Sequence, residues 1–184
     1  MKNVVEFMEL ISSLKELQRT GWKQHEVTGI IDTTASHTLG VVFLCWLFSK
    51  VERVGAEKML KMALVHDLVE SVTGDLTPHE SKRIDRDKLE ESGLNTVEKS
   101  LPSQLTKETR SLIEEFRTGL SKEAKLVRAC DKLETLFQAH FYRKANRLSE
   151  ASFREFLRYA QKACTEGLAK KLLVHVRDAA EEQI

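Results

Sequence analysis

The sequence has few of the residues that interrupt regular structure or cross-link a chain. Its 184 residues include only 2 prolines, 8 glycines and 3 cysteines. Apolar residues recur at three- and four-residue spacing with little strict alternation, which indicates amphipathic helices rather than strands. We therefore predict an all-α protein, and the length fits a single domain over residues 1–184.

The scarcity of cysteine also limits the covalent and metal chemistry of the chain. Cys45, Cys130 and Cys164 are odd in number and form no Cys-x-x-Cys pair. This pattern indicates neither a disulfide framework nor a zinc knuckle, so we predict reduced thiols and a cytoplasmic protein. The N-terminal segment carries Glu6 and Glu9 where a signal peptide needs an apolar stretch, and it is predicted to be part of the fold.

The chain has almost no net charge and no long apolar run. Lysine and arginine number 29 against 28 for aspartate and glutamate, which gives a formal charge of +1. No global field therefore recruits a nucleic acid polymer or an anionic membrane, and any anion must be captured locally. The strongest apolar run, residues 41–48, is far shorter than the roughly 20 residues that span a bilayer, and it is predicted to be a buried core helix.

The periodicity predicts seven helices separated by polar breaks. A glycine in Thr73-Gly74-Asp75 is placed for a left-handed helix end, and Ser121 is placed to cap the longest helix. Residues 21–35 lack helical periodicity and are predicted to be a connecting loop, whereas 78–101 is predicted to be a mobile segment with one short solvated helix. The predicted helices cover residues 4–18, 35–49, 56–72, 87–100, 106–118, 122–144 and 150–177.

Polar side chains interrupt three of the most apolar helices. His66 and Asp67 lie late in helix 56–72, Asp131 lies in the middle of helix 122–144, and His37 begins helix 35–49. Burying such groups is costly unless something pairs with them. Taken singly, each such residue is more often a core polar group that is hydrogen-bonded or ion-paired to a neighbour. Four of them on apolar helices would each need a different partner to account for their burial.

Together these four residues predict one divalent metal ion, bound by His37, His66, Asp67 and Asp131. Two imidazoles and two carboxylates suit Mn, Fe, Co, Ni or Zn better than an all-oxygen Mg or Ca cage, although the sequence leaves the ion's identity open, Mg included. Glu70 lies three and four positions after Asp67 and His66, over the same helical face, where it is predicted to carry a proton.

The order of these residues resembles the H…HD…D pattern of the HD-domain superfamily of metal-dependent phosphohydrolases. Four strings sharpen the resemblance to the HD-domain 5'-deoxynucleotidases, and with the linking residues they span 17 to about 139. They are Arg-Thr-Gly-Trp at 19–22, Ala-Leu-Val-His-Asp-Leu-Val-Glu at 63–70, Thr-Gly-Asp-Leu-Thr-Pro at 73–78, and Glu-Ala-Lys-Leu-Val at 123–127 with Asp-Lys-Leu-Glu at 131–134. One departure is Ser36, which stands where related nucleotidases carry an acidic residue before the first histidine.

The resemblance implies an HD-type helical bundle that hydrolyses a small nucleotide and forms a homodimer. It implies that Glu70 is catalytic and that Asp75 either assists proton transfer or binds the substrate sugar. Arg19 is expected to clamp the phosphate, and Trp22 to form a flat wall for the sugar or base. The alternatives for these two are that Trp22 packs into the core and that Arg19 pairs with a surface carboxylate.

The favoured activity is removal of phosphate from a (deoxy)ribonucleoside 5'-monophosphate. Two alternatives remain at this point. One is an HD phosphodiesterase or pyrophosphohydrolase that acts on another nucleotide. The other is a non-catalytic, nucleotide-sensing HD module, which would have no physical need to keep Glu70 and Asp75.

Overall fold

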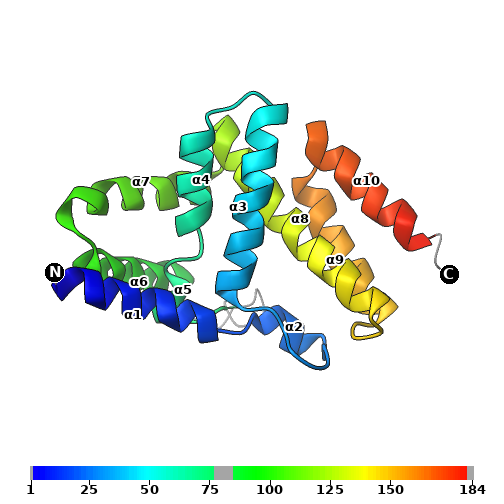
Figure 1. Ribbon diagram of the computed structural model, residues 1–184, viewed down its shortest axis with the longest axis horizontal. Helices are drawn as coiled ribbons and strands as arrows, with labels where there is room; N and C mark the ends of the chain where they lie inside the picture. The colour runs from blue at the N-terminus through cyan, green and yellow to red at the C-terminus, as the bar shows by residue number, and fades with distance from the viewer. Residues whose placement is uncertain (1, 77–84, 182–184) are drawn as a thin grey trace.

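The computed structural model describes residues 2–76 and 85–181. Within these ranges all elements of regular secondary structure are α-helices (Figure 1). The only strand-like pairing there is an isolated antiparallel bridge between Gln18 and Thr33. The all-α prediction is therefore confirmed. The helices are α1 (Lys2–Glu16), α2 (Thr20–Gln24), α3 (Thr34–Val51), α4 (Ala56–Val65), α5 (Glu70–Thr73), α6 (Arg86–Ser100), α7 (Ser103–Thr118), α8 (Lys122–Lys144), α9 (Glu150–Ala163) and α10 (Gly167–Glu181).

Helix α8 is the centre of the fold. It begins as predicted, because the Ser121 hydroxyl accepts a hydrogen bond from the backbone N–H of Ala124. It contacts α3, α4, α7, α9 and α10, and its Leu133 and Leu136 are fully buried. Figure 1 shows α1, α5 and α6 gathered at one end of the molecule and α9 and α10 at the other, with α3 and α8 between them.

Helix α6 is more deeply packed than its polar sequence suggests. We predicted a short solvated helix, but Leu94 and Val97 are both 0% exposed, because α1 and α5 pack on the one apolar stripe that this helix has. The prediction of shallow burial was wrong. The part of the predicted mobile segment at 77–84 lies outside the described residues.

The predicted helix 56–72 is interrupted at the site that carries the polar residues. Helix α4 ends at Val65, and the backbone then tightens into i to i+3 bonding, with Leu68 N–H donating to Val65 O and Glu70 N–H donating to Asp67 O. Helix α5 resumes at Glu70. This tighter turn changes the directions in which His66, Asp67 and Glu70 project.

Two other predicted boundaries were wrong for tertiary reasons. The predicted loop 21–35 contains the short helix α2, and Trp22 anchors it by packing its indole into the core with only 2% exposed. The predicted last helix 150–177 breaks after Ala163 and restarts at Gly167, whose φ of +60° favours glycine. The new helix start is capped by the carboxylate of Glu52, which accepts from the Leu168 N–H at 2.8 Å.

Helix α3 is buried on one face only. His37, Val41 and Cys45 face the core, whereas Phe43 and Trp46 are 58% and 56% exposed. The predicted buried core helix at 41–48 is therefore correct for its inner face and wrong for its outer face. Its 18 residues are long and apolar enough to cross a membrane by length and composition, but 33% of that window is buried inside the fold, and the helix packs on α4 and α8.

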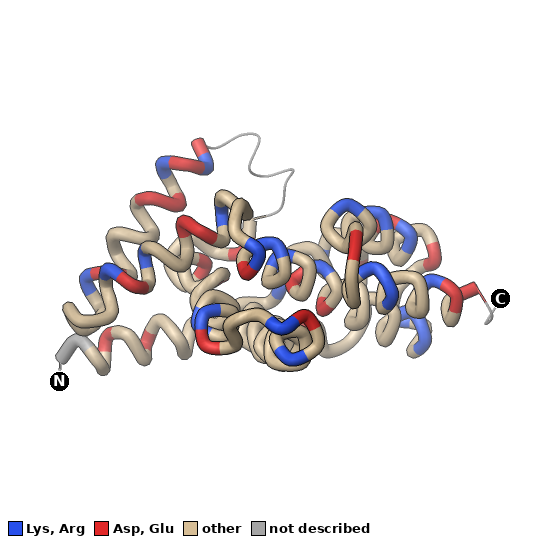
Figure 2. Tube along the Cα trace, turned by 90° about the horizontal axis from the view of Figure 1, so that it is seen from above, with Lys and Arg blue, Asp and Glu red and all other residues tan. Residues whose placement is uncertain are grey.

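Both signs of charge are spread over most helices, in line with the near-zero net charge (Figure 2). Residues 34–49 of α3 are an exception, since they contain no lysine, arginine, aspartate or glutamate. The three cysteines are free and buried. Cys130 lies beside Asp131 in α8, so this thiol is enclosed next to a predicted metal ligand.

Replacing Gly93 by alanine tests the close packing of α6. An added Cβ would lie 2.8 Å from side-chain atoms of Val69 and Thr73. Although alanine favours a helix, the overpacking should destabilise the protein by about 1–3 kcal/mol. Gly21→Ala in α2 is the control, because its Cβ meets nothing within 4 Å, and it should stabilise by about 0.4–1 kcal/mol. Urea unfolding measures both, and a stabilised Gly93→Ala variant would contradict the packing described.

Candidate metal centre

The imidazole of His66 is held by its own backbone. Its Nδ1 lies 2.8 Å from the carbonyl oxygen of Ala63, so Nδ1 donates and Nε2 is left with a free lone pair in the neutral ring. Nε2 is buried, has no hydrogen-bond partner and lies 3.2 Å from Oδ2 of Asp67. A buried nitrogen of this kind is costly unless it coordinates something.

The imidazole of His37 repeats this arrangement from another helix. Its Nδ1 hydrogen-bonds Oε2 of Glu134 on α8. Its Nε2 is buried without a hydrogen-bond partner, 3.2 Å from Oδ1 of Asp131 and 3.8 Å from Oδ2 of Asp67. Both histidine Nε2 atoms thus lie near the Asp67 carboxylate, and that of His37 also lies near Asp131.

The spacing of these atoms fits a shared metal ion. Ligand atoms of His37, His66 and Asp67 lie within 4.8 Å of one another, and Asp131 approaches from the side of His37. Two ligands that each lie about 2.1 Å from one ion, at an angle near 100°, are roughly 3.2 Å apart. The four predicted ligands therefore come together from α3, α8 and the turn between α4 and α5, with a donor set that suits a divalent transition metal.

In the structure, Arg19, His66 and Lys132 partly neutralise the negative charge of Asp67 and Asp131. Burial alone would lower the pKa of His66, but the carboxylates of Asp67 and Asp131 raise that pKa to about 9. Arg19 donates to Oδ2 of Asp67 at 3.2 Å, and although burial opposes it, this carboxylate raises the pKa of Arg19 further. Burial would likewise raise the pKa of Asp131, but Lys132 and His37 hold it well below its usual range. An incoming cation must displace the proton on His66, so metal binding should release protons.

Glu70 lies beside this cluster without joining the ligand set. The Thr34 hydroxyl donates to its Oε2 at 3.2 Å. Burial, followed by the negative charges of Asp67 and Asp75, raises the pKa of Glu70 to about 9. A nearby cation would lower this pKa again, so the protonation of Glu70 can change when a cation binds at the centre or leaves it.

Arg19 and Asp75 lie at the rim, where the chain enters α2. Asp75 accepts a hydrogen bond from the Thr20 N–H, while the Thr20 hydroxyl donates to the backbone oxygen of Asp75 at 2.7 Å. These bonds tie the segment after α5 to the start of α2. Arg19 accordingly pairs with a buried carboxylate of the centre rather than with a surface one.

Trp22 does not face the cluster. Its ring packs edge-on against Tyr142 with centroids 5.2 Å apart and lies 4.6 Å from Phe156. With 2% exposed, the indole occupies the core, as the alternative for this residue described. The flat wall for sugar or base that we expected from it is therefore not present at the surface of the site.

The sequence did not single out three residues that support the centre. Glu134 orients His37, Thr34 holds Glu70, and Gly40 leaves the space that Glu134 occupies, since a Cβ there would lie 2.7 Å from the Glu134 side chain. The sequence signals for Glu134 are its position one helical turn after Asp131 and its place in the Asp-Lys-Leu-Glu string, in which we assigned it no separate role. Ser36, noted as a departure, instead closes a capping box with Thr33 at the start of α3.

Comparison with known families agrees with this geometry. The HD domain family matches residues 11–173. The chain belongs to the HD domain family. Curated relatives include 5'-deoxynucleotidase HDDC2 of Dictyostelium discoideum, 34% identical over 78% of this chain and 80% of the relative, and its namesake in Danio rerio, 33% identical over 82% and 76%.

Solved structures are similar to nearly the whole chain. A crystal structure of a Pyrococcus horikoshii protein is 28% identical, with a TM-score of 0.75, and covers 94% of this chain and 97% of its own. A structure titled as a predicted metal-dependent phosphohydrolase from Magnetospirillum magnetotacticum is 21% identical with a TM-score of 0.71, and it supports the fold alone. The HD-type helical bundle expected from the sequence is confirmed.

Removing the charge of Glu134 tests whether it positions His37. Glu134→Gln keeps an acceptor for Nδ1 but loses the carboxylate, so metal affinity should fall by about 10-fold or more. Calorimetric titration with Mn²⁺ or Co²⁺ measures this, and Glu9→Gln on the exposed face of α1 is the control. An unchanged affinity would make Glu134 a structural residue only.

Proposed function

We propose that this HD domain protein removes phosphate from (deoxy)ribonucleoside 5'-monophosphates with one divalent metal ion. The observation that carries the proposal is the pair of buried, unpartnered Nε2 atoms of His37 and His66, which converge on two carboxylates beside an ionisable Glu70. The names of the curated relatives, which are 5'-deoxynucleotidases, support the substrate class. The activity in these names favours phosphate-ester hydrolysis over the pyrophosphohydrolase and sensing alternatives.

His37, His66, Asp67 and Asp131 would hold the ion. When bound, a divalent metal lowers the pKa of a coordinated water and polarises a phosphate oxygen. The mixed nitrogen and oxygen donors favour Mn, Fe, Co, Ni or Zn, with Mg less suited to the imidazoles. Glu134 and the backbone of Ala63 keep the two rings in the tautomer that coordination needs.

Glu70 is the residue proposed to move the proton. Its carboxyl is partly buried, is held by the Thr34 hydroxyl, and adjoins the ligand cluster. Asp75 adds negative charge that helps keep the pKa of Glu70 high. A carboxyl with a tunable pKa can accept the proton of the attacking water and return one to the leaving 5'-oxygen.

Arg19 is proposed to hold the phosphate at the rim of the metal centre, beside Asp67. Among the described residues, the Arg19 side chain bonds only through Nη1, to Asp67, so the planar fork retains further N–H groups for a dianion. One guanidinium and one ion are enough for a single terminal phosphate, which favours monophosphates over longer chains. Asp75, at the same rim, is placed to accept from a sugar hydroxyl.

The Glu70→Gln variant tests the catalytic role. An amide cannot take the proton, so kcat for dAMP should fall by about 10²–10⁴-fold while metal content stays at the parent level. Phosphate release with Mn²⁺, Co²⁺, Mg²⁺ or Zn²⁺, together with metal analysis of the purified variant, measures both. The parent enzyme should also cleave dAMP faster than dADP or dATP.

Comparing Asp131→Ala with Glu70→Gln distinguishes a metal ligand from a proton carrier. It should lose metal and turnover together, unlike Glu70→Gln. Parent turnover in Glu70→Gln would move the catalytic assignment to Asp75. A parent enzyme that prefers triphosphates would favour the pyrophosphohydrolase alternative.

A homodimer is the proposed assembly, and a cytoplasmic location is proposed from the reduced thiols. The exposed face of α3 supports the dimer, because it places large apolar side chains one turn apart with no charge between them. Contiguous exposed apolar surface of this kind is typical of an interface, and a helix face meeting its own copy gives a closed two-fold pair. The face consists of Leu39, Phe43, Trp46 and Leu47, which are 50–58% exposed.

Trp46→Glu tests this assembly. A charge at the centre of the face should convert the dimer to a monomer, since desolvating an unpaired carboxylate is costly. Sedimentation equilibrium measures the mass, and Leu120→Glu is the control because Leu120 is 79% exposed outside α3. A parent protein that is monomeric at high concentration would contradict the proposal.

A further inference from the structure

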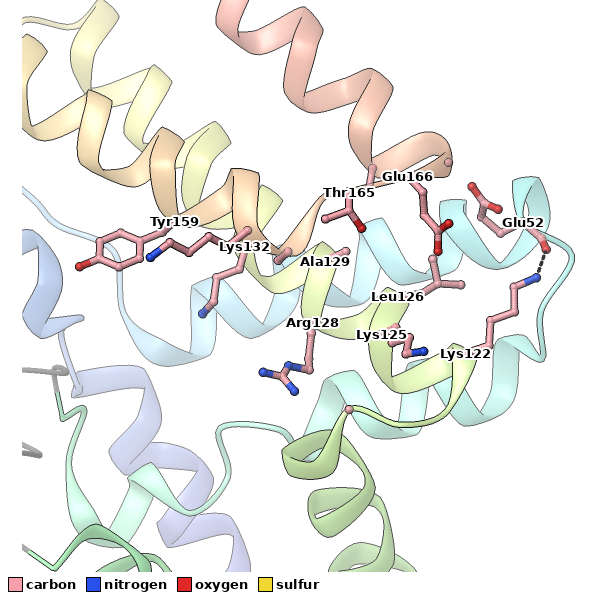
Figure 3. A pocket seen from close by; sticks show the side chains of 15 residues that line it. Glu52, Lys122, Lys125, Leu126, Arg128, Ala129, Lys132, Tyr159, Thr165 and Glu166 are labelled. Carbon is pink, nitrogen blue, oxygen red and sulfur yellow. Dashed lines mark hydrogen bonds between the residues drawn. The ribbon is translucent and has the colours of Figure 1, made fainter.

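A basic groove lies on the surface between α8 and the turn that joins α9 to α10 (Figure 3). Its volume is about 640 Å³. Figure 3 shows Lys122 and Glu52 at one end of the groove and Tyr159 at the other. The basic residues that line it are Lys122, Lys125, Arg128, Lys132 and Lys162, and the acidic ones are Glu52 and Glu166.

The groove is more positive than the molecule as a whole, since five basic and two acidic side chains line it while the whole chain carries a net charge of only +1. One of the two acidic side chains is already engaged, since Glu52 caps α10 by accepting from the Leu168 N–H. Lys122 donates to the backbone oxygen of Glu52, which is a neutral acceptor. The cations of the groove therefore outnumber the carboxylates that are free to neutralise them.

Two of the cations that α8 contributes have side chains with no bonded partner in the described structure. Within residues 2–76 and 85–181, the side chains of Lys125 and Arg128 make no hydrogen bond and no ion pair. Together with Lys132 they follow one another at three- and four-residue spacing, which places them on one face of α8. Like charges at this spacing destabilise a helix, and a concave surface focuses their field on an anion.

The row of cations is longer than a single phosphate. From Lys125 to Lys132 the helix rises about 10 Å. A chain of linked phosphates could contact several of these side chains at once, whereas one phosphate could not. Tyr159, with 51% of its surface exposed, offers a ring at the end of the row, and Nζ of Lys162 lies 5.6 Å from its centroid. An exposed aromatic ring can stack a nucleobase.

We infer that this groove binds an anion with two or more linked phosphate groups, at a place separate from the metal centre. The two sites meet only at Lys132, whose Nζ lies 2.9 Å from Oδ2 of Asp131. An anion that drew Lys132 toward the groove would change the charge beside this metal ligand. The inference does not depend on the substrate of the metal centre, because none of the four proposed metal ligands lines the groove.

Charge reversal at Lys125 tests the groove. Calorimetric titration of the wild-type protein with inorganic triphosphate and with dATP should show binding that weakens as salt increases. Lys125→Glu and Arg128→Glu should each weaken it at least tenfold. Lys107→Glu, an equal charge change on exposed α7, should leave it unchanged, and Lys125→Glu should keep the parent kcat and KM for dAMP.

The two probes distinguish the sources of the phosphate chain. If the occupant is a nucleotide, Tyr159→Ala weakens dATP but not inorganic triphosphate. If it is free polyphosphate, both probes bind alike and Tyr159→Ala changes neither. Absence of binding by both probes would overturn the inference. So would binding that survives Lys125→Glu and Arg128→Glu but is lost in Arg19→Ala, because the anion would then occupy the metal centre.

Discussion

The contact of α3 with α8 at His37 is the constraint on which the rest of the centre depends. It places one imidazole between Glu134, which bonds Nδ1, and Asp131, which lies 3.2 Å from Nε2. The contact needs Gly40, because any larger residue one helical turn after His37 would displace the Glu134 side chain. Burying an imidazole nitrogen without a partner is costly, and coordination of the proposed ion would remove that cost.

The broken helix between α4 and α5 supplies the other half of the centre. A continuous α-helix would keep His66, Asp67 and Glu70 on directions set by 100° steps. The tighter turn at 66–69 instead brings the ligand atoms of His66 and Asp67 together with that of His37 and leaves Glu70 beside them. The proposed ligands and the proposed proton carrier thus have different surroundings although they are close in the chain.

The distribution of charge separates the metal centre from the rest of the surface. Around the centre, Arg19, His66 and Lys132 balance buried carboxylates, and each is paired. Along the outer face of α8 the balance is lost, since Lys125 and Arg128 have no carboxylate partner among the described residues. A chain with a net charge near zero can therefore still present a strong local field, which composition alone does not reveal.

The sequence by itself determined the helical class, the bounds of α8 and the identity of the four proposed ligands. Periodicity and caps are local signals, and ionisable residues in apolar helices are visible without coordinates. Tertiary structure alone decided that Glu134 orients His37, that Trp22 lies in the core and that Glu52 starts α10. Each of these depends on a contact between residues far apart in the chain, and no local pattern encodes which distant helix face will meet another.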